Sequence, residues 1–454
     1  MTGIDLNVWA EPDAAGRRDG ATVAIEGWTY PLTAEARARY FALLAEPACC
    51  FGCLPRDPGQ RVEVFAQEPV AAGRAVRLVG RWRHLPDDDC GWRWQLHDAR
   101  VVATQPAFTR RGLLAAGPLL CVAAAAPGAR AAAADVAAID MHSHAGSLIG
   151  VWRVHDNAPF TPLAAPMRAG GAALVCLAIV PDAPALRSTA DTRFEPFREP
   201  EPGELRAYGE QAFARLRALA QAEGLRIVTD LAGLHAAASA APAAIVAAEG
   251  GDFLEGDPAG VDRAYERWQL RHLQLTHYRV NELGDIQTEA PVYGGLSETG
   301  VEVIRRCNRR GIVVDVAHGT YELVKQAAAV TTKPLVLSHT SLVANPPPRN
   351  RRISPDHARA VTETGGVIGV WPPLHLFPTV TALAGGIARM ADAVGIDHVG
   401  IGTDMGGLIA GSCLPDYEAL PRLIAALRGI GFSAEDVRKV MGGNYARVFA
   451  ATLG

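Results

Sequence analysis

From residue 136 onward, short apolar runs alternate with longer segments of helical pattern. Eight of these runs have the length and aliphatic composition of buried parallel strands, and they occupy residues 137–142, 173–180, 244–249, 272–277, 312–318, 335–339, 367–371 and 399–404. Several intervening segments have the periodicity of amphipathic helices, among them residues 203–222, 260–269, 298–310 and 355–364. This alternation predicts an α/β fold, and its natural closure is a (β/α)8 TIM-type barrel. A doubly wound open sheet is the competing fold.

The polar residues that end these runs favour the barrel. Imidazole or carboxylate side chains stand at the C-terminal ends of six runs, and they are His142, His144, Glu249, His277, His318, His339 and Asp404. In a barrel the C-terminal ends of all strands meet at one mouth, where such enzymes carry their chemistry. The sequence therefore predicts a single site at this mouth.

Residues 1–105 have a different pattern, an alternation of apolar and polar positions that is typical of half-buried strands. The alternation is clearest in residues 21–28, 61–66, 75–82 and 92–97. We expect a separate β-rich module here, and a five-stranded barrel of the OB type fits the pattern. The pattern predicts no activity for this module.

Residues 106–135 separate the predicted N-terminal module, 1–105, from the predicted barrel domain, 136–454. Arg110 and Arg111 precede an apolar stretch and a region of small residues, which is the form of a twin-arginine export signal. Such a signal begins a chain, so its internal position here has three explanations. The assigned start of the chain lies too far upstream, two reading frames are fused, or the segment is an internal membrane anchor. An alanine-rich linker helix is the alternative. If the signal at residues 108–134 works, we expect a periplasmic or membrane-associated protein, and otherwise a cytoplasmic one.

Charge and cysteine content exclude some classes of function. The 454 residues have a net charge of -4 and no dense basic run, so we expect no nucleic-acid partner. The 8 cysteines are too sparse for a disulfide framework. Cys49, Cys50 and Cys53 form a tight cluster that either binds a metal, with Cys90 as a further ligand, or packs as ordinary core cysteines.

The residue types at the predicted mouth suit a metal centre. Neutral imidazoles and carboxylates are good ligands for zinc, and two ions close together need a bridging carboxylate, for which Glu249 is the candidate. His142 and His144 stand two residues apart in a strand, so both imidazoles lie on one face and can reach one ion. His318 and His339, from adjacent strands, then complete the shell of the second ion.

Several of these segments resemble the membrane (renal) dipeptidases, the M19 metallopeptidases of the amidohydrolase superfamily. The similar segments, in the family's order, are Ala248-Glu-Gly-Gly251, Leu275-Thr-His277, Asp315-Val-Ala-His318, Leu337-Ser-His339, Gly395-Ile-Asp-His-Val-Gly-Ile-Gly-Thr-Asp404 and Gly442-Gly-Asn-Tyr-Ala-Arg-Val-Phe449. The resemblance covers residues 136–452. It implies a zinc-dependent dipeptidase with two ions, in which Glu249 bridges, the pair His142 and His144 binds one ion, and the pair His318 and His339 binds the other. A water or hydroxide between the ions is then the nucleophile that attacks the peptide bond.

The resemblance also implies roles for the remaining groups. His277 is expected to hold the scissile carbonyl or the oxyanion, and Asp404 to handle the proton near the substrate's amino group. An arginine is expected to bind the substrate carboxylate. Arg349 matches the family's Arg-Asn pair. An alignment to the family's pattern without gaps, counted back from residues 363–366, instead places Arg351 at the arginine position. The expected partner is a small dipeptide-like substrate, and the oligomeric state stays open, a homodimer included.

One departure from the family bears on the substrate. The family's first strand usually carries His-x-Asp, whereas this chain has His142-Ser-His144, a form common in other amidohydrolases. The exchange of an anionic for a neutral ligand raises the net charge of the site by about one unit. Three functions therefore compete: a zinc dipeptidase, another metal-dependent amidohydrolase acting on a lactone, cyclic amide or N-acyl amino acid, and a binding protein with an inactive barrel. The complete set of ligand residues argues against the third.

Overall fold

The computed structural model describes residues 4–6, 8–9, 15–31, 37–45, 60–71, 73–85, 93–104, 137–149, 160–188, 194–237, 242–347, 349–408 and 411–453. Two predictions lie outside these ranges, and they stay predictions: the signal-like segment with Arg110 and Arg111, and the cluster of Cys49, Cys50 and Cys53. The chain divides into two compact units, one with the N-terminal strands and one with the strands and helices that follow residue 136. Each is described by itself.

The N-terminal unit is a small β-barrel. Its strands are β1 (Ile4–Asp5), β2 (Thr22–Pro31), β3 (Arg37–Leu44), β4 (Arg61–Ala71), β5 (Ala75–His84) and β6 (Trp94–Thr104). They pair in the order β1-β2-β3-β4-β6-β5, and β5 also pairs with β2, which closes the order into a ring. The buried indoles of Trp82 and Trp94 stack within this unit, with ring centroids 5.5 Å apart. The sequence pattern does not predict β3, because its alternation gives way to four consecutive buried residues, 41–44.

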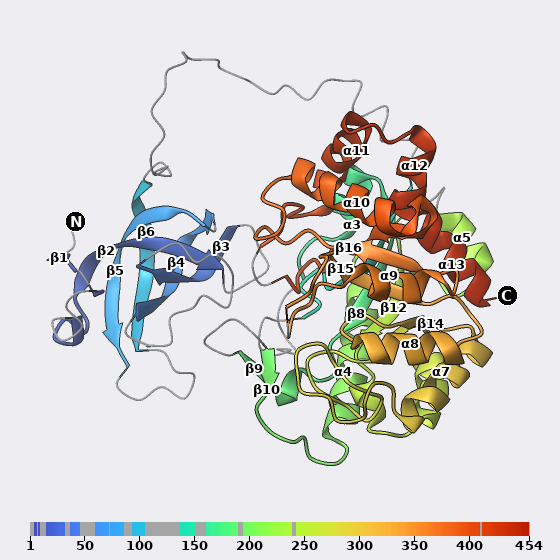
Figure 1. Ribbon diagram of the computed structural model, residues 1–454. Helices are drawn as coiled ribbons and strands as arrows, with labels where there is room; N and C mark the ends of the chain where they lie inside the picture. Colours follow the sequence, from blue (N-terminus) through green and yellow to red (C-terminus); the bar gives the residue numbers. More distant parts are fainter. Residues whose placement is uncertain are drawn as a thin grey trace. The chain divides into compact units, whose positions relative to one another are not determined.

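A parallel sheet of eight strands forms the centre of the larger unit (Figure 1). In spatial and chain order, the strands are β7 (Ala138–Ser143), β8 (Ala172–Ile179), β12 (Ala243–Glu249), β13 (Leu270–Gln274), β14 (Val313–Asp315), β15 (Val336–Thr340), β16 (Val367–Val370) and β17 (Val399–Ile401). A short additional strand, β11 (Arg226–Ile227), pairs with β12, and β9 (Leu186–Ser188) and β10 (Phe194–Pro196) form a separate two-stranded sheet. All eight predicted strands are therefore present, with bounds shifted by at most three residues.

The first and last strands of this sheet meet at their C-terminal ends. The amide of Asp404 donates to the carbonyl of His142 at 2.9 Å, and the amide of His144 donates to the carbonyl of Met405 at 2.7 Å. These hydrogen bonds join the two edges that an open sheet would leave apart. The predicted α/β barrel is thus confirmed, and the chain does not form the competing open sheet.

Two glycines allow the last strands to pack closely. Gly369 lies in β16 and Gly402 directly follows β17. At either position a Cβ atom would lie 1.8 Å from the carbonyl oxygen of Ser338 in β15. Any side chain at these two positions would therefore push against the backbone of β15.

The helices form an outer layer around the sheet (Figure 1). They are α3 (Ala164–Gly170), α4 (Glu204–Ala222), α5 (Leu231–Ala237), α6 (Ala259–Trp268), α7 (Glu298–Arg310), α8 (Tyr321–Val330), α9 (Pro355–Thr362), α10 (Val380–Val394), α11 (Leu420–Gly429), α12 (Ala434–Arg438) and α13 (Asn444–Leu453). Four of them, α4, α6, α7 and α9, correspond to the helices named from the sequence. Helix α7 begins after Ser297, whose hydroxyl accepts from the Gly300 amide at 3.0 Å, and it ends before Gly311, which has a φ of 70°. None of the helices in the described ranges has the length and apolar composition that a bilayer-spanning helix needs.

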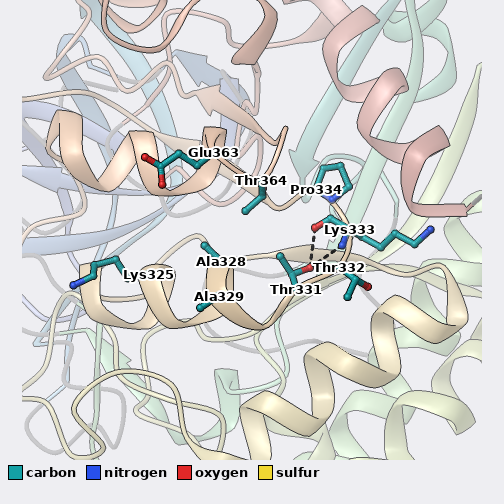
Figure 2. A pocket seen from close by; sticks show the side chains of 9 residues that line it. All are labelled: Lys325, Ala328, Ala329, Thr331, Thr332, Lys333, Pro334, Glu363 and Thr364. Atoms are coloured by element: carbon teal, nitrogen blue, oxygen red, sulfur yellow. Dashed lines mark hydrogen bonds between the residues drawn. The ribbon is translucent and has the colours of Figure 1, made fainter.

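One pocket of the larger unit lies at the start of β15, whereas His339 stands near the end of that strand. Its volume is about 580 Å³, and Figure 2 shows its lining residues around the turn between α8 and β15. These residues are Lys325, Ala328, Ala329, Thr331, Thr332, Lys333, Pro334, Glu363 and Thr364. Because the predicted site lies at the C-terminal ends of the strands, this pocket is not part of it.

Candidate metal centre

Seven polar side chains from six strands gather at the C-terminal mouth of the barrel. His142 and His339 lie within β7 and β15, and Glu249 is the last residue of β12. The other four follow their strands by one to three residues, and they are His144, His277, His318 and Asp404. None of the seven is more than 8% exposed. The structure therefore brings together all seven residues that the sequence pattern selected at strand ends.

The carboxylate of Glu249 lies at the centre of this cluster. Five imidazole Nε2 atoms lie 3.0 to 3.4 Å from its two oxygens, those of His142, His144, His277, His318 and His339. Burial by itself would raise the pKa of Glu249, but the charges of His277 and His142 outweigh burial and hold the pKa well below its usual range. The carboxylate is therefore ionised.

Two pairs of imidazoles face each other across the cluster. The Nε2 atoms of His142 and His144 are 3.2 Å apart, and those of His318 and His339 are 3.1 Å apart. Burial, together with nearby positive groups, lowers the pKa of His318 and of His339 well below the ordinary value, so both rings are neutral. A neutral imidazole offers a lone pair, which is the form that binds a metal ion.

His144 occupies a position that favours positive charge. Its Nδ1 donates to the Ala178 carbonyl at 2.7 Å, which leaves Nε2 to face the carboxylates. Burial lowers the pKa of His144, but the hydrogen bonds to Asp404 and Glu249 outweigh burial and raise the pKa to about 10. A metal ion at Nε2 would supply the positive charge that the two carboxylates stabilise.

Among the described residues, the ligand atoms form three overlapping groups, each with all atoms within 4.8 Å of one another. The groups are His142 with His144 and Asp404, His142 with Glu249 and His339, and Glu249 with His277 and His318. Every predicted ligand belongs to at least one group, and the shared members make the groups one continuous donor cluster. Imidazoles around an ionised carboxylate fit the preferences of zinc. One atom each of Asp404 and His277, for which the resemblance implies catalytic roles, also lies within these groups.

The structure separates the two candidate arginines. Arg351 is 9% exposed, and its Nη2 lies 3.1 Å from Nε2 of His339. Its Nη1 donates to Oε1 of Gln287 at 2.7 Å, and its guanidinium lies over the ring of Trp371. Arg349 is exposed to solvent. Arg351 is thus the arginine that lies at the mouth, in agreement with the alignment that has no gaps between this residue and residues 363–366.

Asp182 holds His277 in place, and the sequence pattern did not select it. Its Oδ1 accepts from Nδ1 of His277 at 2.8 Å, and its Oδ2 accepts from the Tyr278 amide at 3.1 Å. Burial lowers the pKa of His277, but the charges of Asp182 and Glu249 outweigh burial and raise it, which favours an N–H at both ring nitrogens. Asp182 follows β8 by three residues. An acid just after an apolar run is the signal that selected Asp404, and it could have found Asp182 as well.

Asp140 ties the first strand of the barrel to the last. It lies in β7 and is 4% exposed. Its carboxylate accepts from the Thr403 amide at 2.8 Å, from the Thr403 hydroxyl at 2.5 Å and from the Tyr417 hydroxyl at 2.8 Å. These contacts fix the strand end that carries His142 against the one that carries Asp404.

Comparison with known sequences places these features in a family. The sequence model of the membrane dipeptidases, peptidase family M19, matches residues 157–453. Dipeptidase verJ of Clonostachys rogersoniana is 32% identical over 214 residues, which are 45% of this chain and 54% of that protein. Dipeptidase aclJ of Aspergillus oryzae is 33% identical over 206 residues, which are 42% of this chain and 48% of that protein. The chain thus spans about half the length of these curated relatives.

Solved structures share the fold. The probable dipeptidase PvdM from Pseudomonas aeruginosa aligns with a TM-score of 0.60 and 20% identity over 72% of this chain and 98% of its own. A metallopeptidase from Rhodobacter sphaeroides, liganded with a phosphinate mimic of the dipeptide L-Ala-D-Ala, aligns with a TM-score of 0.58 and 20% identity over 70% of this chain and 99% of its own. At this identity the likeness establishes the barrel fold alone.

Proposed function

Since the chain belongs to the membrane dipeptidase family, peptidase family M19, we propose that it is a zinc-dependent dipeptidase with a binuclear centre. The observation that carries the proposal is the convergence of five imidazole Nε2 atoms on the carboxylate of Glu249. The donor cluster combines imidazoles with an ionised carboxylate, which are ligand types that zinc prefers.

Five residues hold the ions in this proposal. His142 and His144 bind one ion, His318 and His339 bind the other, and Glu249 bridges them. When bound, the ions supply Lewis-acid polarisation of the scissile carbonyl and make water acidic enough to act as the nucleophile at neutral pH. The position of His318 and His339 supports their assignment, because their Nε2 atoms lie 3.1 and 3.4 Å from Oε1 of Glu249.

His277 is the proposed donor to the substrate's carbonyl oxygen. Asp182 fixes its Nδ1, and its Nε2 lies 3.4 Å from Oε1 of Glu249, so this nitrogen faces the donor cluster. The raised pKa of the ring favours an N–H at this position. A fixed donor in a buried site stabilises the negative charge that develops on the carbonyl oxygen.

Two further residues suit the charged ends of a dipeptide. Arg351 is proposed to bind the substrate carboxylate, because its guanidinium reaches the mouth and a planar fork can pair with both carboxylate oxygens. Asp404 is proposed to accept the proton released from the nucleophile and to lie near the substrate's amino group. Together they would position a short peptide with both ends free.

Two observations bear on the substrate class, and each favours a different candidate. The Rhodobacter sphaeroides metallopeptidase carries a mimic of L-Ala-D-Ala, so we propose dipeptides as substrates, including those with a D-residue on the carboxyl side. The His142-Ser-His144 motif favours a second candidate, a metal-dependent amidohydrolase that acts on an N-acyl amino acid, a lactone or a cyclic amide. The two differ in one requirement, because only a dipeptidase needs a free amino group on the substrate.

We also propose that the N-terminal unit is a barrel of the OB type. The ring order β2-β3-β4-β6-β5, closed by the pairing of β5 with β2, supports this assignment, as does the parallel pairing of β4 with β6. An OB barrel has five strands in a Greek-key arrangement. The assignment concerns the fold, and no activity is proposed for this unit.

Zinc content and hydrolysis, measured on the same purified protein, test the enzymatic proposal. We expect about two zinc ions per chain and cleavage of L-Ala-D-Ala, and we expect Glu249→Gln to lose both tightly bound zinc and cleavage. Glu363→Gln is the matched control, because this exposed carboxylate lies in the pocket at the start of β15. Bound zinc with cleavage of N-acetylalanine but not of dipeptides would favour the second candidate. A protein that binds no zinc would contradict both.

A further inference from the structure

A buried carboxylate that is not one of the proposed ligands ends β14. Asp315 is the last residue of this strand, and its side chain is fully buried. Among the described residues it belongs to none of the three donor groups, and the proposed reaction gives it no role. A carboxylate in the core is costly unless its oxygens have donors, so its contacts indicate what it does.

One oxygen of Asp315 joins two segments that carry proposed ligands. Its Oδ1 accepts from the Ala317 amide at 3.0 Å and from the Ser338 amide at 3.1 Å. Ala317 immediately precedes His318 in the chain, and Ser338 immediately precedes His339. The same oxygen therefore holds together the two segments whose imidazole Nε2 atoms lie 3.1 Å apart.

The other oxygen of Asp315 is anchored in the core of the barrel. Its Oδ2 lies 3.1 Å from Nε2 of His272 in β13, and Nδ1 of that ring lies 2.9 Å from the hydroxyl of Tyr445 in α13. His272 and Tyr445 are both buried. Both oxygens of the carboxylate thus have partners, and packed side chains fix the position of Oδ1.

We propose that Asp315 is a positioning residue for one of the two ions, the ion that His318 and His339 bind. The proposal rests on the proposed binuclear centre and deepens it. Hydrogen bonds to a carboxylate are charge-assisted, and they are about twice as strong as those between neutral groups. Loss of the carboxylate would let the segments before His318 and His339 move independently, and partners that orient metal ligands contribute strongly to metal affinity.

Asp140 makes the corresponding contacts for the other histidine pair. Its Oδ1 accepts from the His142 amide at 3.3 Å and from the Thr403 amide at 2.8 Å. Asp140 is therefore tied to the segment that carries His142 and His144, whereas Asp315 is tied to neither of these residues by a hydrogen bond in the described part of the chain. Each proposed ion thus has its own buried carboxyl group, and the two effects are separable.

Zinc affinity tests the proposal without relying on activity. Stoichiometry would be measured by elemental analysis, and the affinity of each ion by competition with chromophoric chelators. We expect Asp315→Asn to weaken one ion by about 10- to 100-fold, because the amide keeps the shape of the side chain but not its charge. The other ion should stay within about twofold of its wild-type affinity.

Single-ion backgrounds identify the ion that is weakened. In a His144→Ala background, which keeps the pair His318 and His339, Asp315→Asn should still weaken zinc binding by about 10- to 100-fold. In a His339→Ala background, which keeps the pair His142 and His144, it should change the affinity by less than about twofold. Asp140→Asn is the matched control, and its effects in the two backgrounds should be reversed.

His272→Leu gives a second test that keeps Asp315 but removes the partner of its Oδ2. It should weaken the same ion by a smaller factor. A general loss of packing would weaken both ions alike, so equal losses in folded Asp315→Asn or His272→Leu would overturn the proposal. Wild-type affinity for both ions in these variants would overturn it as well, and would leave the binuclear centre standing. A wild type that binds no zinc would instead overturn the proposed function.

Discussion

Replacing Asp182 with alanine should lower both stability and turnover. Its carboxylate is fully buried and accepts from Nδ1 of His277 at 2.8 Å and from the Tyr278 amide at 3.1 Å. A buried donor left without an acceptor costs about 1–3 kcal/mol, so the two together predict a loss of about 2–6 kcal/mol in the free energy of unfolding. His277, the proposed donor to the substrate's carbonyl oxygen, also loses the partner that fixes its ring. A misplaced catalytic group costs about 100-fold in rate.

Asp182→Asn separates the orientation of His277 from the packing of the side chain. Asparagine has nearly the same size and keeps one acceptor oxygen, so it can satisfy one of the two donors. We expect a stability between those of the wild type and the alanine variant. We also expect kcat to fall by more than KM changes, because His277 is proposed to act on the carbonyl oxygen in the transition state.

Urea denaturation and steady-state kinetics of the zinc-loaded protein with L-Ala-D-Ala would measure these effects. Asp182→Ala is expected to differ from the wild type in both assays. An unfolding free energy within about 0.5 kcal/mol of the wild type, together with a kcat within about twofold, would refute the reasoning. Neither buried donor would then depend on this carboxylate.

Arg351→Lys should raise KM for a dipeptide by about 10- to 100-fold, because an ammonium cannot make the paired hydrogen bonds of a guanidinium, whereas Arg349→Lys at an exposed position should leave KM nearly unchanged. Equal KM values for the two variants would contradict the assignment. Burial, and then the charge of Arg351, lower the pKa of His357 from 6.5 to about 4. The unfolded chain therefore binds a proton that the folded protein does not, and stability should fall by up to about 3 kcal/mol as the pH drops from 6.5 to 4. His357→Gln should flatten this dependence in urea melts, and a curve parallel to the wild type would count against it. Gly402→Ala should destabilise the barrel by about 3 kcal/mol or more, because its Cβ would lie 1.8 Å from a backbone oxygen. Gly385→Ala in α10, where the nearest atom is 3.6 Å away, should stabilise by about 0.5–1 kcal/mol. Thermal melts would show whether Gly402→Ala lowers and Gly385→Ala raises the melting temperature. Equal shifts for the two variants would argue against the steric explanation.

The positions of the site residues could be predicted from the sequence because a barrel has a simple geometry. Glu249, His318 and His339 each end or closely follow an apolar run, and parallel strands in a closed barrel bring such ends to one mouth. Several strands end earlier than predicted, because residues such as His277 and Asp404 lie beyond the last residue that forms regular β-sheet hydrogen bonds. Strand bounds depend on hydrogen bonds with neighbours, which a local pattern does not report.

Residues in loops were harder to predict. Asp182 follows a strand but was not selected, and Arg349 and Arg351 could not be separated by their places in the chain. A loop has no periodicity that gives the direction of a side chain. Only the folded chain shows Arg351 buried at the mouth and Arg349 exposed.

The sequence by itself determined the alternation of strands and helices, the residue types at the strand ends, and through them the family and the character of the site. Local periodicity and the identity of side chains carry this information. The tertiary structure alone decided which donor atoms meet, including the approach of Asp404 to His144 and the hold of Asp182 on His277. These pairs join segments far apart in the chain, and their distances depend on the closure of the barrel. In that closure, backbone hydrogen bonds join the C-terminal ends of β7 and β17.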